Sequence, residues 1–299
     1  MTTTVLTRHS LAERQPQARR YLMCPPTFFD VTYSINPWMD PHRSVDQDRA
    51  LRQWTRLVEA YRACGHQVDL LTPLPGLPDM VFAANGATVV DGEVLQARFA
   101  HPQRKPEAAA HADWHRGHGA AYGGRGVRSA VAVNEAEGDF AVVSRRILAG
   151  YGFRTSLDAH RELAELTGRP VLSLELVDPF FYHLDVALTV LDDRTDRIAY
   201  YPGAFSPASQ ILLAAEFPDA IIATPADATA FGLNSVSDGR HVFMPAHAPG
   251  MREQLRAAGY LPVEIDLGEL ALGGGSVKCC TQEIRPAIHP EPLCTGGTP

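Results

Sequence analysis

The chain has 299 residues, of which 45% are hydrophobic and 20% charged, and its formal net charge is −7. This composition is typical of a folded globular protein and excludes a collagen-like, coiled-coil or largely disordered chain. The acidic balance, without a dense run of basic residues, argues against nucleic-acid binding, because phosphate backbones are recognised by clustered cations. No stretch reaches the roughly 20 apolar residues of a membrane helix or resembles a signal peptide, so we expect a cytoplasmic protein with no membrane partner.

Pairs of a helix and a strand recur along the chain. Apolar residues at helical spacing predict helices over residues 46–64, 106–121, 156–167, 206–216 and 250–258. A short apolar strand follows each helix, beginning near residues 67, 127, 170, 220 and 262. Turn residues between these pairs predict strand hairpins over residues 86–99, 140–150, 186–201 and 235–245, the clearest turn being Asp91-Gly92.

These repeats predict one closed domain. Five units of two or three strands and one helix cannot bury separate cores, but they can close around a pseudo-fivefold axis with a polar centre. We therefore predict an α/β fold, a five-bladed α/β-propeller, in a single domain over residues 1–299, with its core at about 20–285 and a loose tail over 286–299. A doubly wound α/β sheet is the alternative that the periodicity does not exclude.

A glycine-rich turn precedes two adjacent cysteines near the C-terminus. Residues 273–281 have the sequence GGGSVKCCT, and the glycines let the backbone approach a ligand closely. We predict a strand after them, in which Cys279 and Cys280 face opposite sides. A thiol beside such a turn is a candidate nucleophile, whereas two ordinary buried cysteines are the simpler interpretation of this segment alone. Cys294 falls in the predicted tail and is a poor candidate.

A histidine and a carboxylate lie two residues apart at the start of another predicted strand. Residues 183–185 have the sequence HLD, and alternate strand residues share a face, so His183 and Asp185 are expected to point into one cavity. A histidine distant in sequence is the usual partner of a reactive cysteine. A satisfied structural pair is the alternative.

Two further segments place polar residues beside predicted strands. Residues 134–139 have the sequence NEAEGD, and three carboxylates so close together indicate either a solvated turn or a site for a cationic substrate. Asp79 and Asn85 stand at the ends of an apolar, strand-like run, where each is a candidate cap or site residue.

Three histidines offer a metal-centred alternative. His111, His115 and His118 share one face of the predicted helix 106–121, as zinc ligands can. The segment is polar and lacks the acidic base of an HExxH motif, so we expect a solvent-facing helix and no metal.

Taken in order, these segments resemble the guanidine-modifying superfamily, which includes arginine deiminases, dimethylarginine dimethylaminohydrolases and amidinotransferases and has the five-bladed pentein fold. The resemblance extends from about Tyr21 to Ile284. Cys279 in GGGSVKCCT matches the family nucleophile, and His183 in HLD matches the general acid/base. The segments FDVTYSINPWM, VFAANG and LNSVSDGR look most like bacterial dimethylargininases and arginine dihydrolases.

The resemblance implies roles for further residues. The family acid motif matches EAEGD, which favours Glu135 over Glu137 as the catalytic carboxylate. Arg154 matches the residue that grips the substrate α-carboxylate. Deiminases and typical dimethylargininases carry an aspartate where this chain has Asn85, whereas the arginine dihydrolases have asparagine there. The implied substrate-binding set is Asp185, Asn85, Arg154, Arg98, Asp79 and Asn36.

The residue chemistry and the resemblance together predict a cysteine-dependent hydrolase of the guanidino C–N bond of a free arginine derivative. The first candidate reaction converts dimethylarginine to citrulline and dimethylamine through a covalent S-alkylthiouronium intermediate. Arginine dihydrolase, which forms ornithine, ammonia and CO₂, or arginine deiminase is the alternative. An amidinotransferase or a catalytically inactive arginine-binding protein fits less well. We expect a small guanidino amino acid as partner, no cofactor and no metal; the sequence leaves the oligomeric state open, a homodimer included.

Overall fold

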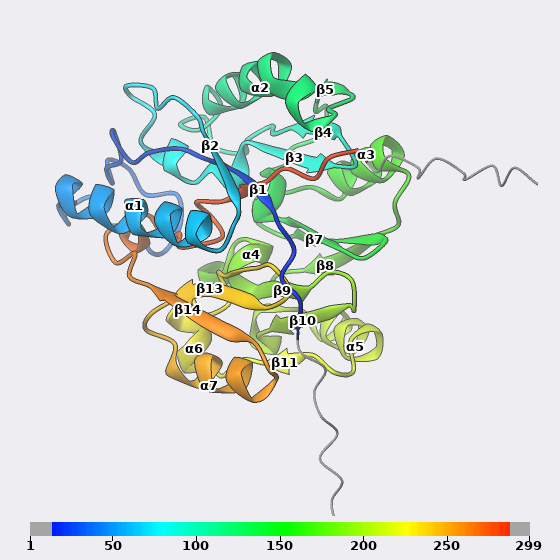
Figure 1. The fold of residues 1–299 in the computed structure, drawn as a ribbon. Coiled ribbons are helices and arrows are strands. Elements are labelled where there is room, and N and C mark those ends of the chain that lie inside the picture. The colour runs from blue at the N-terminus through cyan, green and yellow to red at the C-terminus, as the bar shows by residue number, and fades with distance from the viewer. Residues whose placement is uncertain (1–13, 288–299) are drawn as a thin grey trace, which may run out of the picture.

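The computed structural model describes residues 14–287, and its strands form five three-stranded sheets arranged in a ring. Helices α1, α2, α3, α5 and α7 lie on the outside of this ring, and the short helix α4 lies near its centre (Figure 1). Each sheet contains one antiparallel and one parallel strand pair. The predicted five-bladed α/β-propeller is therefore confirmed.

The helices predicted from the sequence are present with small shifts of their ends. The α-helices are α1 Gln47–Ala63, α2 Glu107–His118, α3 Leu157–Thr167, α4 Leu184–Ala187, α5 Pro207–Glu216, α6 Pro225–Thr229 and α7 Pro249–Ala257. The strands are β1 Arg20–Met23, β2 Gln67–Leu70, β3 Ala87–Val90, β4 Glu93–Gln96, β5 Gly126–Ser129, β6 Phe140–Val143, β7 Arg146–Tyr151, β8 Val171–Glu175, β9 Leu188–Asp192, β10 Arg197–Tyr200, β11 Ile221–Ile222, β12 Val236–Ser237, β13 His241–Pro245, β14 Leu261–Ile265 and β15 Gln282–Glu283.

Helix α1 shows why the repeat folds as it does. The Asp46 side chain accepts a hydrogen bond from the Arg49 amide and caps the helix. Trp54, Leu57 and Tyr61 recur at helical spacing on its buried face. The helix crosses the outside of the sheet, and β2 then pairs in parallel with β1, as a strand after a crossover helix must.

The two ends of the described chain close the ring. β15 pairs antiparallel with β1, with Tyr21 opposite Glu283 and Leu22 opposite Gln282. In the other four sheets this antiparallel pair is a local hairpin, which turn residues reveal, whereas here the partners are distant in sequence. The repeat pattern does not predict this pairing. The pairing of β15 with β1 brings the cysteine-bearing turn before β15 into the centre of the molecule.

Several segments predicted as strand are turns or short helices. Residue 183 precedes α4, and β9 begins only at residue 188. Residues 277–280 form a turn, and β15 begins after it. The run between Asp79 and Asn85 forms two 3₁₀-helices, η1 Pro78–Val81 and η2 Ala83–Asn85. Residues 136–138 form the 3₁₀-helix η4, directly before β6. In each case the turn lets several side chains point to the centre, whereas a strand would point alternate ones away.

Two of the three histidines of α2, His111 and His115, are buried and only His118 is exposed, which corrects the expectation of a solvent-facing helix. His111 packs on Gly86, where a Cβ would come within 2.1 Å of the imidazole. His115 contacts the Tyr122 hydroxyl and the Gln282 side chain. Burial lowers the pKa of His111 to about 3 and that of His115 to about 4, so both are neutral near pH 7. Over residues 14–287, no three potential metal ligands are grouped closely enough to hold an ion.

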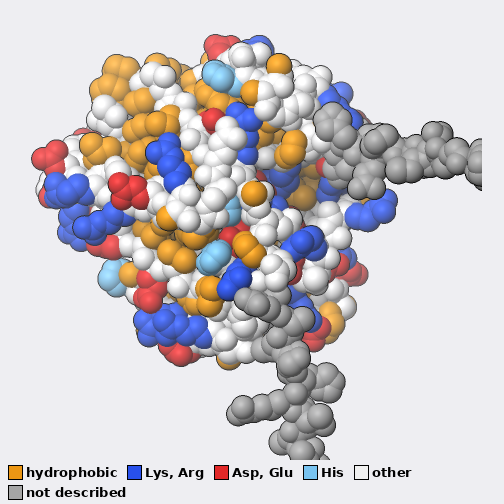
Figure 2. Space-filling view, in the orientation of Figure 1, with side chains coloured by type: hydrophobic (Ala, Val, Ile, Leu, Met, Phe, Trp, Pro, Cys, Tyr) orange, Lys and Arg blue, Asp and Glu red, His pale blue; other side chains and the backbone are white. Residues whose placement is uncertain are grey.

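Helix length and the distribution of surface charge bear on whether this protein could bind a membrane or a nucleic acid. Within the described part of the chain, no helix is long and apolar enough to cross a bilayer. On the face drawn in Figure 2, acidic and basic side chains are interspersed. This face therefore lacks the clustered cations that a nucleic acid would require.

Candidate active site

Each of the five sheets contributes polar side chains to the centre. They come from the segment just before the strand that pairs antiparallel with the central strand of that sheet. The contributions are Asp79 and Asn85 before β3, Glu135 before β6, His183 and Asp185 before β9, Asn234 before β12 and Cys279 before β15. All seven residues are almost fully buried. The pseudo-fivefold repeat thus brings these five equivalent segments together at the centre of the molecule.

The Cys279 sulfur contacts groups from two other sheets. Sγ lies 3.1 Å from Oδ2 of Asp185 and 3.1 Å from Nδ2 of Asn234. Burial raises the pKa of the Cys279 thiol well above its ordinary value, and the neighbouring Asp185 carboxylate raises it further. In this arrangement the sulfur is a thiol that donates to Asp185.

His183 and Glu135 form a buried pair, and His183 lies two residues before Asp185, which contacts the Cys279 sulfur. Nε2 of His183 lies 2.9 Å from Oε2 of Glu135, and Nη1 of Arg154 lies 2.8 Å from the same oxygen. Burial alone would raise the pKa of Glu135, but the ion pair with Arg154 and the hydrogen bond with His183 lower it overall, so Glu135 is ionised. His183 Nδ1 is buried and has no hydrogen-bond partner among the described residues. This nitrogen can exchange a proton with a bound molecule.

The acid segment is folded tightly against the histidine. A Cβ on Gly138 would lie 2.3 Å from Nδ2 of Asn85 and 3.1 Å from Nδ1 of His183, so this position requires glycine. Asp139 accepts hydrogen bonds from the Thr155 hydroxyl and from the Leu184 amide. The bond from the Leu184 amide joins the acid segment to the turn that carries His183, and the bond from Thr155 joins it to the segment after β7.

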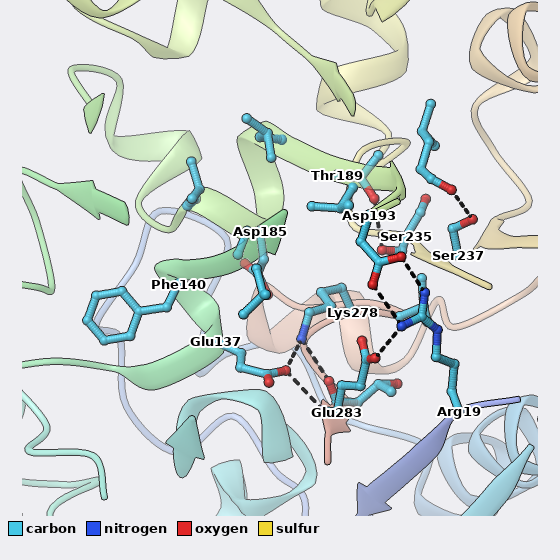
Figure 3. Close-up of a pocket in the computed structure, with 18 of the residues that line it drawn as sticks. Arg19, Glu137, Phe140, Asp185, Thr189, Asp193, Ser235, Ser237, Lys278 and Glu283 are labelled. Carbon is cyan, nitrogen blue, oxygen red and sulfur yellow. Dashed lines mark hydrogen bonds and ion pairs between the residues drawn. The ribbon is translucent and has the colours of Figure 1, made fainter. Parts of the chain in front are cut away.

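Glu137 has a different environment from Glu135. Its carboxylate binds Nζ of Lys278 at 2.7 Å, Nη1 of Arg285 at 2.7 Å and the Glu283 amide at 3.0 Å. Figure 3 shows Glu137, Lys278 and Glu283 at one side of a cavity that Asp185 also lines. Glu137 therefore binds the C-terminal segment to the sheet of β6, β7 and β8. Glu135 is the carboxylate that contacts His183.

Two carboxylates at the centre each have an oxygen without a partner. Tyr33 donates its hydroxyl hydrogen to Oδ2 of Asp79 at 2.8 Å, but Oδ1 of Asp79 and Oδ1 of Asp185 have no hydrogen-bond partner among the described residues. Burial raises the pKa of Asp185 to about 6, although Lys278 lowers it in part. A buried carboxylate oxygen without a donor is energetically unfavourable. These oxygens can accept hydrogen bonds from a cation that carries several N–H groups.

Asn85 is held by a buried arginine that sequence reasoning missed. Its Oδ1 accepts from Nη1 of Arg104 at 2.9 Å, and its Nδ2 donates to the Glu135 carbonyl at 3.2 Å. Arg104 also makes a two-point ion pair with Glu107. Because the sequence around Arg104 is polar, no signal in it distinguishes a buried arginine from an exposed one.

Asn36 and Arg98 are placed differently from the central group. Asn36 donates to the Gly273 carbonyl at 3.1 Å, so it supports the glycine turn. Arg98 is exposed, donates to the Val131 carbonyl and pairs through its backbone with Asn134. The structure therefore brings Asn36 to the turn before Cys279, and leaves Arg98 at the rim.

Asn234 is the second residue that sequence reasoning missed. It contacts the sulfur of Cys279, and it occupies the fourth of the five equivalent positions described above. The repeat itself was the signal that could have identified it, because LNSVSDG precedes a predicted strand as the other four site segments do.

Comparison with known proteins agrees with this geometry. No family model matches the chain. The chain is 54% identical over 277 residues to an N(G),N(G)-dimethylarginine dimethylaminohydrolase of Mycobacterium tuberculosis, a match that covers 93% of this chain and 89% of that protein. The chain belongs to the dimethylarginine dimethylaminohydrolase family. This confirms the resemblance drawn from GGGSVKCCT and HLD.

Solved structures place this dimethylarginine dimethylaminohydrolase family member in the pentein superfamily. The N-terminal domain of a cyanobacterial arginine dihydrolase, bound to substrate, matches with a TM-score of 0.84 and 34% identity, over 90% of this chain and all of that domain. The Pseudomonas aeruginosa dimethylarginine dimethylaminohydrolase, complexed with citrulline, matches with a TM-score of 0.75 and 19% identity, again over 90% of this chain and all of that one. The second match shows the shared fold.

The contact between Asp185 and Cys279 predicts an unusual effect of substitution. Asp185→Asn removes a negative charge beside the sulfur, so the thiol pKa should fall and Cys279 should react about tenfold faster with iodoacetamide at pH 8. The measurement is mass spectrometry of the tryptic peptide over residues 279–299, since the Arg285-Pro286 bond resists trypsin, with fragmentation to separate Cys279 from Cys280 and Cys294. Asp193→Asn, in the adjacent cavity, is the control and should leave the rate unchanged. A slower or unchanged rate for Asp185→Asn would contradict this account.

Proposed function

We propose that this protein hydrolyses the guanidino C–N bond of free dimethylarginine to give citrulline and dimethylamine, with Cys279 as the catalytic nucleophile. The observation that carries the proposal is the contact of the buried Cys279 thiol with Asp185, which keeps an unpartnered oxygen and lies two residues after the His183 that is paired with Glu135. The 54% identity to a dimethylarginine dimethylaminohydrolase over most of the chain supports the same reaction class, hydrolysis of C–N bonds in linear amidines.

The substrate guanidinium fits the acceptors at the centre. It is planar and cationic, and its N–H groups would satisfy Oδ1 of Asp79 and Oδ1 of Asp185. Arg154 is the candidate partner of the α-carboxylate, since its Nη2 now donates to the Ile35 carbonyl, which a carboxylate could replace. Arg98 is a second candidate at the rim, and Arg104 holds Asn85 against the guanidinium position.

The substrate itself helps to ionise the nucleophile. In the free protein, burial and Asp185 keep Cys279 protonated. A guanidinium beside Asp185 and the sulfur neutralises the carboxylate and stabilises the thiolate, and the thiol proton passes to His183, which becomes the imidazolium. The nucleophile is then formed where it is used, directly beside the carbon that it attacks.

The reaction balances with His183 as the proton carrier. The Cys279 thiolate adds to the guanidinium carbon, and the His183 imidazolium donates its proton to the dimethylamine nitrogen as the C–N bond breaks. This leaves a cationic S-alkylthiouronium and a neutral imidazole. His183 then takes a proton from water, the hydroxide adds to the carbon, and the C–S bond breaks to return the thiolate. The proton released as the ureido carbonyl forms leaves with dimethylamine as dimethylammonium. Glu135 stabilises the imidazolium.

Product analysis tests this function. Incubation of the purified protein with asymmetric dimethylarginine should give citrulline and dimethylamine in equal amounts, detected by mass spectrometry. Cys279→Ser should lose at least about a thousandfold in kcat, because a hydroxyl is a far weaker nucleophile than a thiolate. Cys280→Ser, at the adjacent thiol, is the matched control and should retain turnover. Full activity of Cys279→Ser would refute the covalent mechanism.

The pKa of Asp185 predicts how activity depends on pH. Because burial raises this pKa to about 6, the carboxylate takes up a proton below that pH and no longer attracts a cation. We expect kcat/KM for dimethylarginine to be constant just above pH 7 and to fall about tenfold per pH unit below pH 6. Asp139, with a pKa also raised to about 6 by burial, protonates in the same range. A profile that stays flat to pH 5 would exclude this role of Asp185.

Arginine dihydrolase is the second candidate function, and Asn85 is the observation that favours it. The family resemblance places asparagine at this position in the dihydrolases, and a dihydrolase domain is 34% identical to this chain. Such an enzyme hydrolyses arginine to citrulline and ammonia, and then hydrolyses the neutral ureido group to ornithine, ammonia and CO₂. The second round needs a site that accepts an uncharged group.

Asn85→Asp separates the two candidates. The added negative charge favours the guanidinium cation over the neutral ureido group, so ornithine formation from arginine should fall more than citrulline formation. Both products are measured by mass spectrometry in one incubation. An equal loss of both products would remove this role from Asn85. Absence of ornithine from the unaltered protein would remove the dihydrolase function.

The proposed function also includes the domain organisation, the partner and the location of this protein. We propose that residues 1–299 act as one catalytic domain, with a small guanidino amino acid as partner and with no cofactor in the steps above. The four cysteines in the described part of the chain are unbridged, which agrees with a reducing, cytoplasmic location. The tail prediction for 286–299 and the interpretation of Cys294 lie almost wholly outside the described residues.

A further inference from the structure

Asn234 lies at the centre of the turn that carries the nucleophile. It is fully buried between α6 and β12. Its side-chain oxygen accepts hydrogen bonds from the backbone amides of Ser276, Lys278 and Cys279, at 3.1, 3.0 and 3.2 Å. One acceptor with three donors holds the whole turn in a single conformation.

These three bonds also fix the direction of the amide group. Oxygen and nitrogen of an asparagine are assigned from their partners, and three N–H donors require the oxygen. The NH₂ group of Asn234 must therefore face the other way. There it donates to the Asp185 carbonyl at 3.0 Å and to the Cys279 sulfur at 3.1 Å.

Most other groups around the sulfur disfavour a negative charge on it, and the Ser276 amide is an exception that lowers the thiol pKa. Asp185 and Tyr182 face it from the segment around α4, and Cys280 lies in its own turn. The Lys278 ammonium is bound to the Glu137 carboxylate and the Thr281 carbonyl. The Asn234 amide is thus a neutral donor in contact with the sulfur, and such donors bind an anion more strongly than a thiol.

We propose that Asn234 is a catalytic residue whose side-chain N–H donates a hydrogen bond to the Cys279 sulfur and stabilises the thiolate, both before it attacks and when it departs. Its role in turnover rests on the hydrolysis proposed above. The hydrogen bond itself does not, because it is present in the free protein. The same amide also joins the nucleophile turn to the backbone of Asp185.

The experiment measures the reactivity of Cys279 without any substrate. The rate of alkylation by iodoacetamide is followed from pH 6 to 10 by fragmentation of the tryptic peptide over residues 279–299. Asn234→Ala removes the donor without adding a charge, and should shift the inflection upward by about one pH unit, so that the rate at pH 8 falls about tenfold. Where turnover is measurable, kcat should fall while KM changes little.

A second variant separates the donor from the acceptor. Asn234→Asp keeps an oxygen for the three backbone amides, but it replaces the donor to sulfur with an acceptor, so its alkylation should be slower still. Ser237→Asp is the charge control, because Ser237 lines the adjacent cavity with Lys278 and its hydroxyl binds the Leu191 carbonyl. Circular dichroism confirms that each variant is folded.

The outcomes distinguish this proposal from the function it rests on. An unchanged or higher alkylation rate in folded Asn234→Ala overturns the hydrogen-bond role. If Asn234→Ala does not fold, Asn234→Asp decides, and a loss no greater than that of Ser237→Asp overturns it. If the unaltered protein hydrolyses no guanidino substrate but Asn234→Ala slows alkylation, the proposed function fails and the hydrogen bond stands.

Discussion

Burial of several carboxylates in one small volume is the constraint on which the centre of this protein depends. Burial raises the free energy of each ionised carboxylate, and a fold can contain them only where cations or N–H donors compensate. Glu135 and Glu137 are compensated, the first by Arg154 and His183, the second by Lys278, Arg285 and the Glu283 amide. Asp79 and Asp185 are not, since each keeps an unpartnered oxygen. This difference separates the supporting carboxylates from those that await a cation.

The same balance of charge controls the nucleophile. Asp185 accepts from the Cys279 thiol and opposes its ionisation, whereas the Asn234 amide donates to the sulfur and favours it. Because Asn234 also binds the Asp185 carbonyl, the two opposing groups are held at a fixed separation. A small change in local charge, such as the arrival of a guanidinium, is then enough to change the protonation state of the sulfur.

The repeat in the sequence predicts the blades, because each blade is built from local helix periodicity and local turns. It does not predict the pairing of β1 with β15, which depends on contacts across the whole chain. The resemblance supplied His183 and Cys279, but the strand predicted for each was wrong, since these segments turn to aim side chains at one point. Arg104 and the buried face of α2 were missed because polar residues beside an apolar pattern are usually exposed.

The closing strand also determines the order in which the protein can be assembled. Four blades consist of contiguous chain, so they can form as the ribosome releases them. The first blade must wait for β15, which is synthesised more than 250 residues after β1. Until then the edge of β1 is unpaired, and such edges favour association with other chains. The Cys279 thiol reaches the centre in the same step that covers this edge, so the proposed nucleophile joins the other central residues only as the ring closes.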